Sequence, residues 1–250
     1  MKIAWESTGK GSPLLLIQGL GYGRWGWDPI VPGLDDEHLV IAFDNRGIGE
    51  SDKPEGPYTA AQMARDALQV LDEAEIDRAH VFGASLAGMI AQELAVIAPE
   101  RVDKLVLGCT TPGGPDAVPM PEVTLALFAE AASLAPEVAL RRFVENALGE
   151  NPPAELVDEL FALRVLNPPD QAGWQAQAAA GMGFQGVDDE ITVPTLILSG
   201  TADNVVDYRN AELLAARIPG ARVELFAGAG HLFFWEQPDA CVRILNDFLA

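Results

Sequence analysis

Between a polar segment and a helical pattern the chain reads His80-Val81-Phe82-Gly83-Ala84-Ser85-Leu86-Ala87-Gly88. The apolar run predicts a buried strand, and the residues from Leu86 to Ala98 predict a helix. Ser85 would then lie on a sharp strand-to-helix turn, with its hydroxyl above the sheet edge. Such a turn needs small residues two positions before and after the serine, a need that Gly83 meets fully and Ala87 in part. The pattern makes Ser85 a candidate nucleophile.

Short apolar runs and helical patterns alternate on both sides of this turn. Near-continuous hydrophobic strands indicate burial on both faces, as in a parallel sheet covered by helices. The alternation therefore predicts a doubly wound α/β domain. The other expected strands are Leu14–Ile17, Leu39–Phe43, Lys104–Leu107, Thr195–Leu198 and Arg222–Phe226, and the other expected helices are Thr59–Glu75, Tyr208–Ile218 and Pro238–Leu249.

The alternation stops after the stiff connector Pro112-Gly113-Gly114-Pro115 and resumes at Val193. We expect a helical cap (lid) inserted at residues 113–190, within a core domain formed by residues 1–112 and 191–250. Prolines suited to first-turn positions separate the helical segments of this insertion. The segments are expected near Val123–Ser133, Pro136–Leu148, Ala154–Leu166 and Pro169–Ala180.

The chain has three histidines, and one of them follows a strand end in a glycine loop. His231 follows Gly228-Ala229-Gly230, just beyond an expected strand, and open α/β sheets place their functional sites in loops at such strand ends. An imidazole is also the side chain best suited to move a proton near neutral pH. His80 begins the strand that leads to Ser85 and is expected to be structural, whereas His38 is expected to be exposed.

The acid that would orient this base is expected at Asp203, just past the strand Thr195–Leu198. Asp207 is a rival, but it begins the next helix and is better interpreted as an N-cap or first-turn acid. The order Ser85, Asp203, His231 is the chain order of α/β-hydrolase triads and differs from that of other triad folds.

A serine attack on a carbonyl also needs fixed N–H donors for the oxyanion. Leu86 offers one backbone N–H at the start of its helix. The other donor is expected from Gln18-Gly19-Leu20-Gly21, because the glycines let this loop aim the Leu20 N–H at the site.

These residues resemble the α/β-hydrolase superfamily, specifically its small capped serine hydrolases (the carboxylesterase, enol-lactonase and carbon–carbon hydrolase branch). The segment Asp44–Ser51 is similar to the family's turn after the second parallel strand, and Glu236-Gln237-Pro238 is similar to its lead into the last helix. Gln18-Gly19 stands where the family usually has His-Gly. The resemblance implies an α/β-hydrolase fold, with about eight mostly parallel strands flanked by helices and the site under the cap.

The activity that these expectations imply is hydrolysis of a carboxylic ester or lactone of a small, largely apolar substrate, through a Ser-His-Asp triad and an acyl-enzyme. No metal and no cofactor is expected. Ser85 argues against haloalkane dehalogenases and epoxide hydrolases, which place Asp at this turn. Tentative substrate contacts are the aromatic residues Trp25, Phe128, Phe143, Phe161, Trp174, Phe184 and Phe233.

Three alternatives stay open. A carbon–carbon bond hydrolase acting on a vinylogous diketone could bind a carboxylate through Arg141, Arg142 or Arg164. Trp235 fits the spacing of that group, whereas Leu232 replaces its usual tryptophan. The same triad could serve as a cofactor-free perhydrolase, and the fold could also form a non-catalytic receptor for a small ligand.

Composition limits the partners. The net charge of −21 disfavours nucleic acid and anionic lipid, and no apolar run is long enough to predict a membrane span. Cys109 and Cys241 are too few for a disulfide framework and are interpreted as small buried side chains, which fits a reducing cytoplasm. The expected partner is thus a small ester or lactone substrate, for a monomer or a homodimer.

Overall fold

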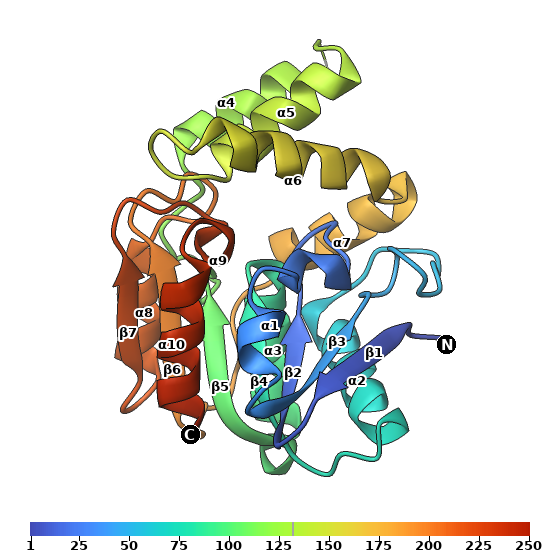
Figure 1. Cartoon of the computed structure of the whole chain (residues 1–250), viewed down its shortest axis with the longest axis vertical. Helices are drawn as coiled ribbons and strands as arrows, with labels where there is room; N and C mark the ends of the chain where they lie inside the picture. Colours follow the sequence, from blue (N-terminus) through green and yellow to red (C-terminus); the bar gives the residue numbers. More distant parts are fainter. Residues whose placement is uncertain (132) are drawn as a thin grey trace.

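The computed structural model describes residues 1–131 and 133–250, and a seven-stranded sheet forms its centre (Figure 1). The strand order is β1-β3-β2-β4-β5-β6-β7; β1 is antiparallel to β3, and the other neighbours are parallel. The expected α/β architecture is therefore confirmed. The strands are β1 Trp5–Gly9, β2 Ser12–Ile17, β3 His38–Phe43, β4 Ala79–Ala84, β5 Val102–Gly108, β6 Thr195–Gly200 and β7 Arg222–Phe226.

The strand count differs from the expectation of about eight, since the described residues form seven strands. The edge strand β1 was also absent from the expected strands. Four of its five residues, Glu6 to Gly9, are exposed, so it lacks the apolar run that marks the buried strands. It joins the sheet through backbone pairing with β3.

Two helical layers cover the sheet. Along β2, Leu14 and Leu16 face a cluster with α1 Val31–Leu34 and α10 Pro238–Leu249. Leu15 and Ile17 face the opposite cluster, which contains α2 Ala60–Glu73, α3 Leu86–Ile97 and α8 Arg209–Arg217. All four side chains are 0% exposed, and burying each contributes about 1.5–3 kcal/mol. The alternation explains why the strands are apolar at successive positions.

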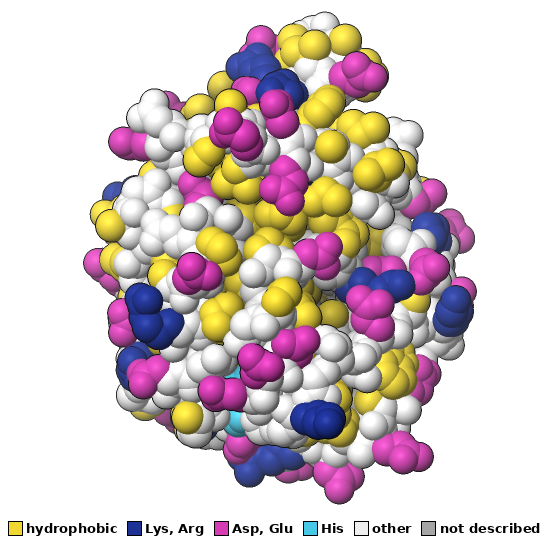
Figure 2. Space-filling view, in the orientation of Figure 1, with side chains coloured by type: hydrophobic (Ala, Val, Ile, Leu, Met, Phe, Trp, Pro, Cys, Tyr) yellow, Lys and Arg dark blue, Asp and Glu magenta, His cyan; other side chains and the backbone are white. Residues whose placement is uncertain are grey.

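Four helices lie between β5 and β6, and the described residues there contain no strand. They are α4 Glu122–Ala131, α5 Pro136–Asn146, α6 Ala154–Leu166 and α7 Gln171–Gly183. The helix expected near Val123–Ser133 includes residue 132, which lies outside the described residues. In Figure 1, α4, α5 and α6 stand beyond the carboxyl ends of the strands, while α7 lies closer to the core. Hydrophobic side chains gather below these outer helices on the face shown in Figure 2.

At the opposite edge of the sheet, where the strands begin, one expectation is wrong. His38, expected to be exposed, begins β3 and is only 2% exposed. Its Nδ1 lies 2.7 Å from the Ser12 hydroxyl, because the two residues are register partners on β3 and β2. His80 is also buried, as its structural interpretation requires.

Three short elements complete the fold: the 3-10 helices Arg24–Trp27 and Pro99–Arg101, and α9 Phe233–Glu236. Across the described ranges, no helix combines the length and apolar character needed to cross a membrane.

Candidate active site

Ser85 occupies the turn between β4 and α3 with φ 60° and ψ −123°. A non-glycine residue held in such a conformation costs about 1–3 kcal/mol, which the surroundings must offset. The Ser85 N–H donates to the Gly108 carbonyl on β5 at 2.8 Å, and the Thr110 hydroxyl donates to the Ser85 carbonyl at 2.8 Å. Neighbouring backbone thus holds the strained peptide on both sides.

The small residues around Ser85 have the steric role expected from the sequence. A Cβ atom on Gly83 would lie 2.2 Å from the Ala87 carbonyl oxygen, so strand and helix pass too closely for a side chain. The methyl group of Ala87 is accommodated there and is fully buried. The alanine at this position is therefore compatible with the sharp turn.

Asp203 and His231 form a buried pair at the carboxyl ends of β6 and β7. His231 Nδ1 lies 2.8 Å from Asp203 Oδ2, and the Asp203 side chain has no exposed surface. The other carboxylate oxygen accepts from the N–H groups of Val205 and Val206, at 2.7 and 2.9 Å. These bonds leave His231 Nε2 as the ring nitrogen directed away from the acid.

The loops that carry the pair are joined by backbone contacts. The Ala202 N–H donates to the Ala229 carbonyl at 2.9 Å. Glu236 accepts from the N–H groups of Gly230 and Gly149, at 2.7 and 2.9 Å, and so connects the His231 loop to the chain after α5. The expected lead Glu236-Gln237-Pro238 therefore has a structural function.

The electrostatics of the pair favour a charged imidazole. Burial by itself would lower the pKa of His231, but the adjacent Asp203 carboxylate, together with Cys109, outweighs burial and raises this pKa well above 6.5. A buried carboxylate that holds Nδ1 also fixes the tautomer with Nε2 free to accept a proton.

Cys109, interpreted from the sequence as a small buried side chain, lies beside Asp203 and His231. Its thiol and the polar atoms of Asp203 and His231 all lie within 4.8 Å of one another. Cys109 follows β5 directly and has φ 39°, an unfavourable value for a residue with a side chain. Its position just after an expected strand was the sequence feature that could have placed Cys109 at the site.

The rival acid Asp207 has the helix-start role that its position indicated. Its carboxylate accepts from the Arg209 backbone N–H and pairs with the Arg209 guanidinium, which lowers the pKa of Asp207. The structure therefore joins Asp203, and not Asp207, to His231.

The loop after β2 lies against Ser85. A Cβ atom on Gly19 would lie 3.5 Å from Ser85 Oγ and 2.9 Å from its Cβ. Gln18, which replaces the usual histidine, uses its side-chain oxygen to accept from the Gly19 N–H at 3.1 Å. Asn45, from the expected turn Asp44–Ser51, donates to the Gln18 carbonyl at 2.8 Å. That turn therefore supports the loop beside Ser85.

Two backbone N–H groups near Ser85 remain available. Within residues 1–131 and 133–250, no acceptor pairs with the N–H of Leu20 or of Leu86. The flanking N–H groups of Gly19, Gly21 and Tyr22 are all engaged.

The candidate substrate aromatics divide into several environments. Phe233 is fully buried and stacks on Phe226 in the core. Phe128 packs on Phe143 between α4 and α5 and is 42% exposed. Trp25 packs on Tyr22 and Trp235. Trp174 packs against Gly21, Phe161 lies under the Arg141 guanidinium, and Phe184 joins the core.

A cavity of about 370 Å³ opens beside the loop after β2. Trp25, Arg24 and Asp44 line its core side, and Asn167, Pro168 and Pro169 line its other side. None of Ser85, Asp203 and His231 lines it, so this cavity neighbours the candidate site rather than contains it.

The chain belongs to the alpha/beta hydrolase fold family, whose model matches residues 12–238. A poly(3-hydroxyalkanoate) depolymerase of Ectopseudomonas oleovorans is 30% identical over 240 residues, covering 95% of this chain and 84% of that protein. The enol-lactonase from Burkholderia xenovorans LB400 superposes with a TM-score of 0.83 at 27% identity, covering 99% and 96% of the two chains.

A meta-cleavage product hydrolase from Pseudomonas fluorescens IP01 superposes equally well, with a TM-score of 0.84 at 26% identity over 99% of this chain and 93% of that one. These relatives carry the names of different hydrolases at similar distances from this chain. Family membership alone therefore leaves the substrate open.

Proposed function

We propose that the protein is a serine hydrolase that cleaves a carboxylic ester or lactone through an acyl-enzyme. Ser85 would be the nucleophile, His231 the general base and Asp203 the acid that orients it. The observation that carries the proposal is the buried 2.8 Å bond between His231 and Asp203, at the same sheet edge as the strained turn of Ser85.

In the proposed reaction, His231 Nε2 takes the Ser85 proton while Oγ attacks the carbonyl carbon. The N–H groups of Leu20 and Leu86 stabilise the oxyanion, and the protonated imidazole then gives its proton to the leaving alkoxide. Water, deprotonated by His231, then attacks the acyl-enzyme; the acid is released as the protonated imidazole returns its proton to Ser85 Oγ. In the described part of the chain the N–H groups of Leu20 and Leu86 have no acceptor, which supports this assignment because an oxyanion hole requires donors without internal acceptors.

The four helices α4–α7 would form the cap over the site and select the substrate. We retain Trp25 and Trp174 as proposed substrate contacts, because both lie beside the loop that carries Leu20. Phe128, Phe143 and Phe233 have packing partners that account for their positions.

Arg141 and Arg142 do not favour the carbon–carbon hydrolase alternative. Arg141 pairs with Asp158 and Arg142 pairs with Glu130, so both guanidinium groups already have a carboxylate partner. Arg164 donates to the Gly21 carbonyl.

A covalent probe tests the proposed nucleophile. A fluorophosphonate should label the wild-type protein, and Ser85→Ala should abolish both labelling and turnover of p-nitrophenyl esters while the circular dichroism spectrum is retained. A panel of linear esters and lactones of graded size, with a vinylogous diketone acid as comparison, would then define the substrate. Unchanged turnover in Ser85→Ala would refute the proposal, and an unlabelled, inactive wild type would favour a ligand receptor.

A further inference from the structure

Gly21 fastens the loop that carries Leu20 to the inserted helices through both of its polar groups. The Gly21 N–H donates to Gln177 Oε1 on α7 at 3.0 Å. The Gly21 carbonyl accepts from Arg164 Nη1 on α6 at 2.6 Å. The peptide groups that follow the Leu20 N–H are thus held from outside the core sheet.

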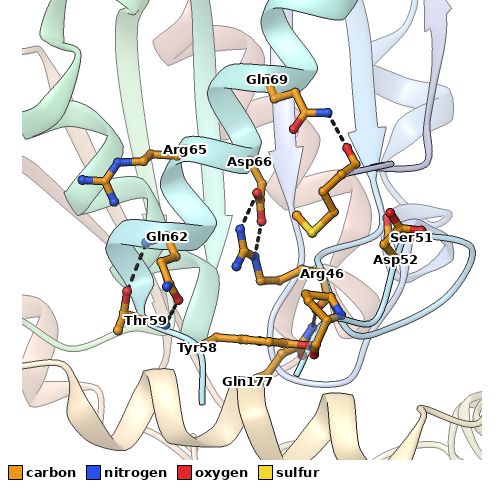
Figure 3. Close-up of polar contacts among 12 residues, drawn as sticks. Arg46, Ser51, Asp52, Tyr58, Thr59, Gln62, Arg65, Asp66, Gln69 and Gln177 are labelled. Carbon is orange, nitrogen blue, oxygen red and sulfur yellow. Dashed lines mark hydrogen bonds and ion pairs between the residues drawn. The ribbon is translucent and has the colours of Figure 1, made fainter. Parts of the chain in front are cut away.

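Gln177 connects this loop to a second core loop. It is 0% exposed, and its Nε2 donates to the Arg46 carbonyl at 2.8 Å. The Arg46 guanidinium in turn makes two bonds to Asp66 on α2, at 2.5 and 2.7 Å, and lies over the Tyr58 ring (Figure 3). Because the amide uses its acceptor on one loop and its donor on the other, Gln177 fixes their relative position.

The backbone of α7 permits little variation in this arrangement. A Cβ atom on Gly173 would lie 1.8 Å from the Gly47 carbonyl oxygen, so helix and loop are in direct backbone contact. One turn further along, the Ala176 carbonyl accepts from the Tyr58 N–H at 3.3 Å. These contacts place Gln177 at a defined depth over the core.

Arg164 differs from the other arginines of the insertion. Arg141 and Arg142 form ion pairs with exposed acids, whereas Arg164 lies 4.4 Å above the Tyr22 ring. Among the described residues, no carboxylate pairs with Arg164. Its contacts are therefore directed to the loop formed by Gly21 and Tyr22.

We propose that Gln177 and Arg164 are positioning residues for the oxyanion hole. By holding the N–H and the carbonyl of Gly21, they aim the Leu20 N–H at the oxyanion formed on attack by Ser85. This inference rests on the proposed function and adds a role for α6 and α7. These helices set the geometry of the reaction for every substrate, in addition to any part they take in selecting one.

The test uses apolar replacements of similar length and matched controls. Gln177→Met and Arg164→Met remove the two anchors, and Arg164→Lys keeps a donor for the Gly21 carbonyl. Gln175→Met, at an exposed position two residues away on α7, and Arg142→Met serve as controls. Each variant is assayed for kcat and KM on one p-nitrophenyl ester, for inhibition by an arylboronic acid and for thermal unfolding.

We expect kcat to fall about 10- to 100-fold in both anchor variants, less than the loss of a whole oxyanion donor, with KM changing less than about twofold. Affinity for the boronic acid, which forms a tetrahedral adduct on Ser85, should weaken by about the same factor as kcat. Arg164→Lys should recover most of the loss, and both controls should match the wild type. In the double variant the loss should be smaller than the product of the single losses, because both anchors hold the same residue, Gly21.

Three results would overturn the inference: anchor variants with unchanged kcat and KM, an unchanged kcat with a raised KM, or a kcat loss without weaker boronic acid binding. If Gln177→Met does not fold, the same assays on Arg164→Met and Arg164→Lys test the inference, because Arg164 is partly exposed and its replacement should not prevent folding. Fluorophosphonate labelling of the wild type distinguishes a failure of the proposed function from a failure of this inference. An unlabelled wild type contradicts the proposed function, whereas a labelled wild type with fully active anchor variants contradicts this inference alone.

Discussion

Buried histidines lie at both edges of the sheet, where the strands begin and where they end, but their surroundings are opposite. At the carboxyl edge, His231 is bonded to the fully buried carboxylate of Asp203. At the amino edge, His38 contacts the Ser12 hydroxyl and lies about perpendicular to His80, with the ring centroids 6.0 Å apart. Ser12 and His38 are in contact at the amino edge, whereas the turn of Ser85 and the bonded pair of Asp203 and His231 share the carboxyl edge.

The charge environment distinguishes the two edges. Burial lowers the pKa of His38. The Glu37 carboxylate and the contacts with Ser12 and Asn246 raise this pKa, but they offset the effect of burial only in part. Burial likewise lowers the pKa of His80, with further lowering by His38, Lys104 and Arg78 against the opposing effect of Asp103. At the other edge Asp203 raises the pKa of His231. A buried acid, more than a nearby hydroxyl, therefore identifies a histidine that can accept a proton.

The largest expected effect comes from removing that acid. Asp203→Asn should lower kcat by about 10⁴, because the amide no longer fixes the required tautomer or stabilises the imidazolium. It should also move the acidic limb of the kcat/KM profile to lower pH, since loss of the carboxylate lowers the pKa of His231. Asp207→Asn is the control and should retain wild-type kcat. Equal losses in the two variants would remove the distinction between Asp203 and its rival.

An intermediate effect is expected on the pH dependence of stability. Because the folded-state pKa values of His38 and His80 are lowered, their neutral forms contribute stability above about pH 6.5 that is lost as the pH falls through the folded-state values. Each group can add a slope of up to about 1.4 kcal/mol per pH unit.

Urea unfolding at a series of pH values measures this slope, and the double variant His38→Asn, His80→Asn should flatten it. An equally steep loss in the double variant would assign the acid sensitivity to other groups. His231 acts in the opposite direction, because its raised pKa contributes stability below about pH 6.5 that is lost as the pH rises through the folded-state value.

The smallest effect is expected for the serine at the amino edge. Ser12→Ala should leave ester turnover and fluorophosphonate labelling unchanged and reduce the free energy of unfolding by about 1 kcal/mol, the net value of one hydrogen bond. Side-by-side assays of Ser12→Ala and Ser85→Ala would sharpen the comparison. Reduced turnover in a folded Ser12→Ala protein would mean that the amino edge takes part in the reaction.

Much of the fold could be predicted because strands buried on both faces leave a strong apolar signal. The position of Asp203 and His231 after strand ends likewise indicated that they could meet, and the structure brings them into contact. The edge strand β1 was missed because its side chains are mostly exposed and its pairing is carried by the backbone. Such pairing leaves little trace in residue type.

Other features depend on segments that are far apart in the chain. The burial of His38 requires β2 and α10 to pack around the start of β3, which its polar neighbours Asp36 and Glu37 do not indicate. The importance of Gln177 is similarly hidden, since it is one of three glutamines in α7 and the sequence does not distinguish it from Gln171 and Gln175. Only the folded chain places its amide between Gly21 and Arg46.

The backbone contact between Gly173 and Gly47 has a consequence for evolution and engineering. Val123, Leu125 and Val138 on helices α4 and α5 are about half exposed, and the Thr124 hydroxyl on α4 donates to the Asn204 carbonyl. Under the proposed function, we expect exchange of these outer helices to change which substrate is accepted. Replacement of α7 would instead require compensating changes in two core loops, so we expect this helix to be inherited together with them.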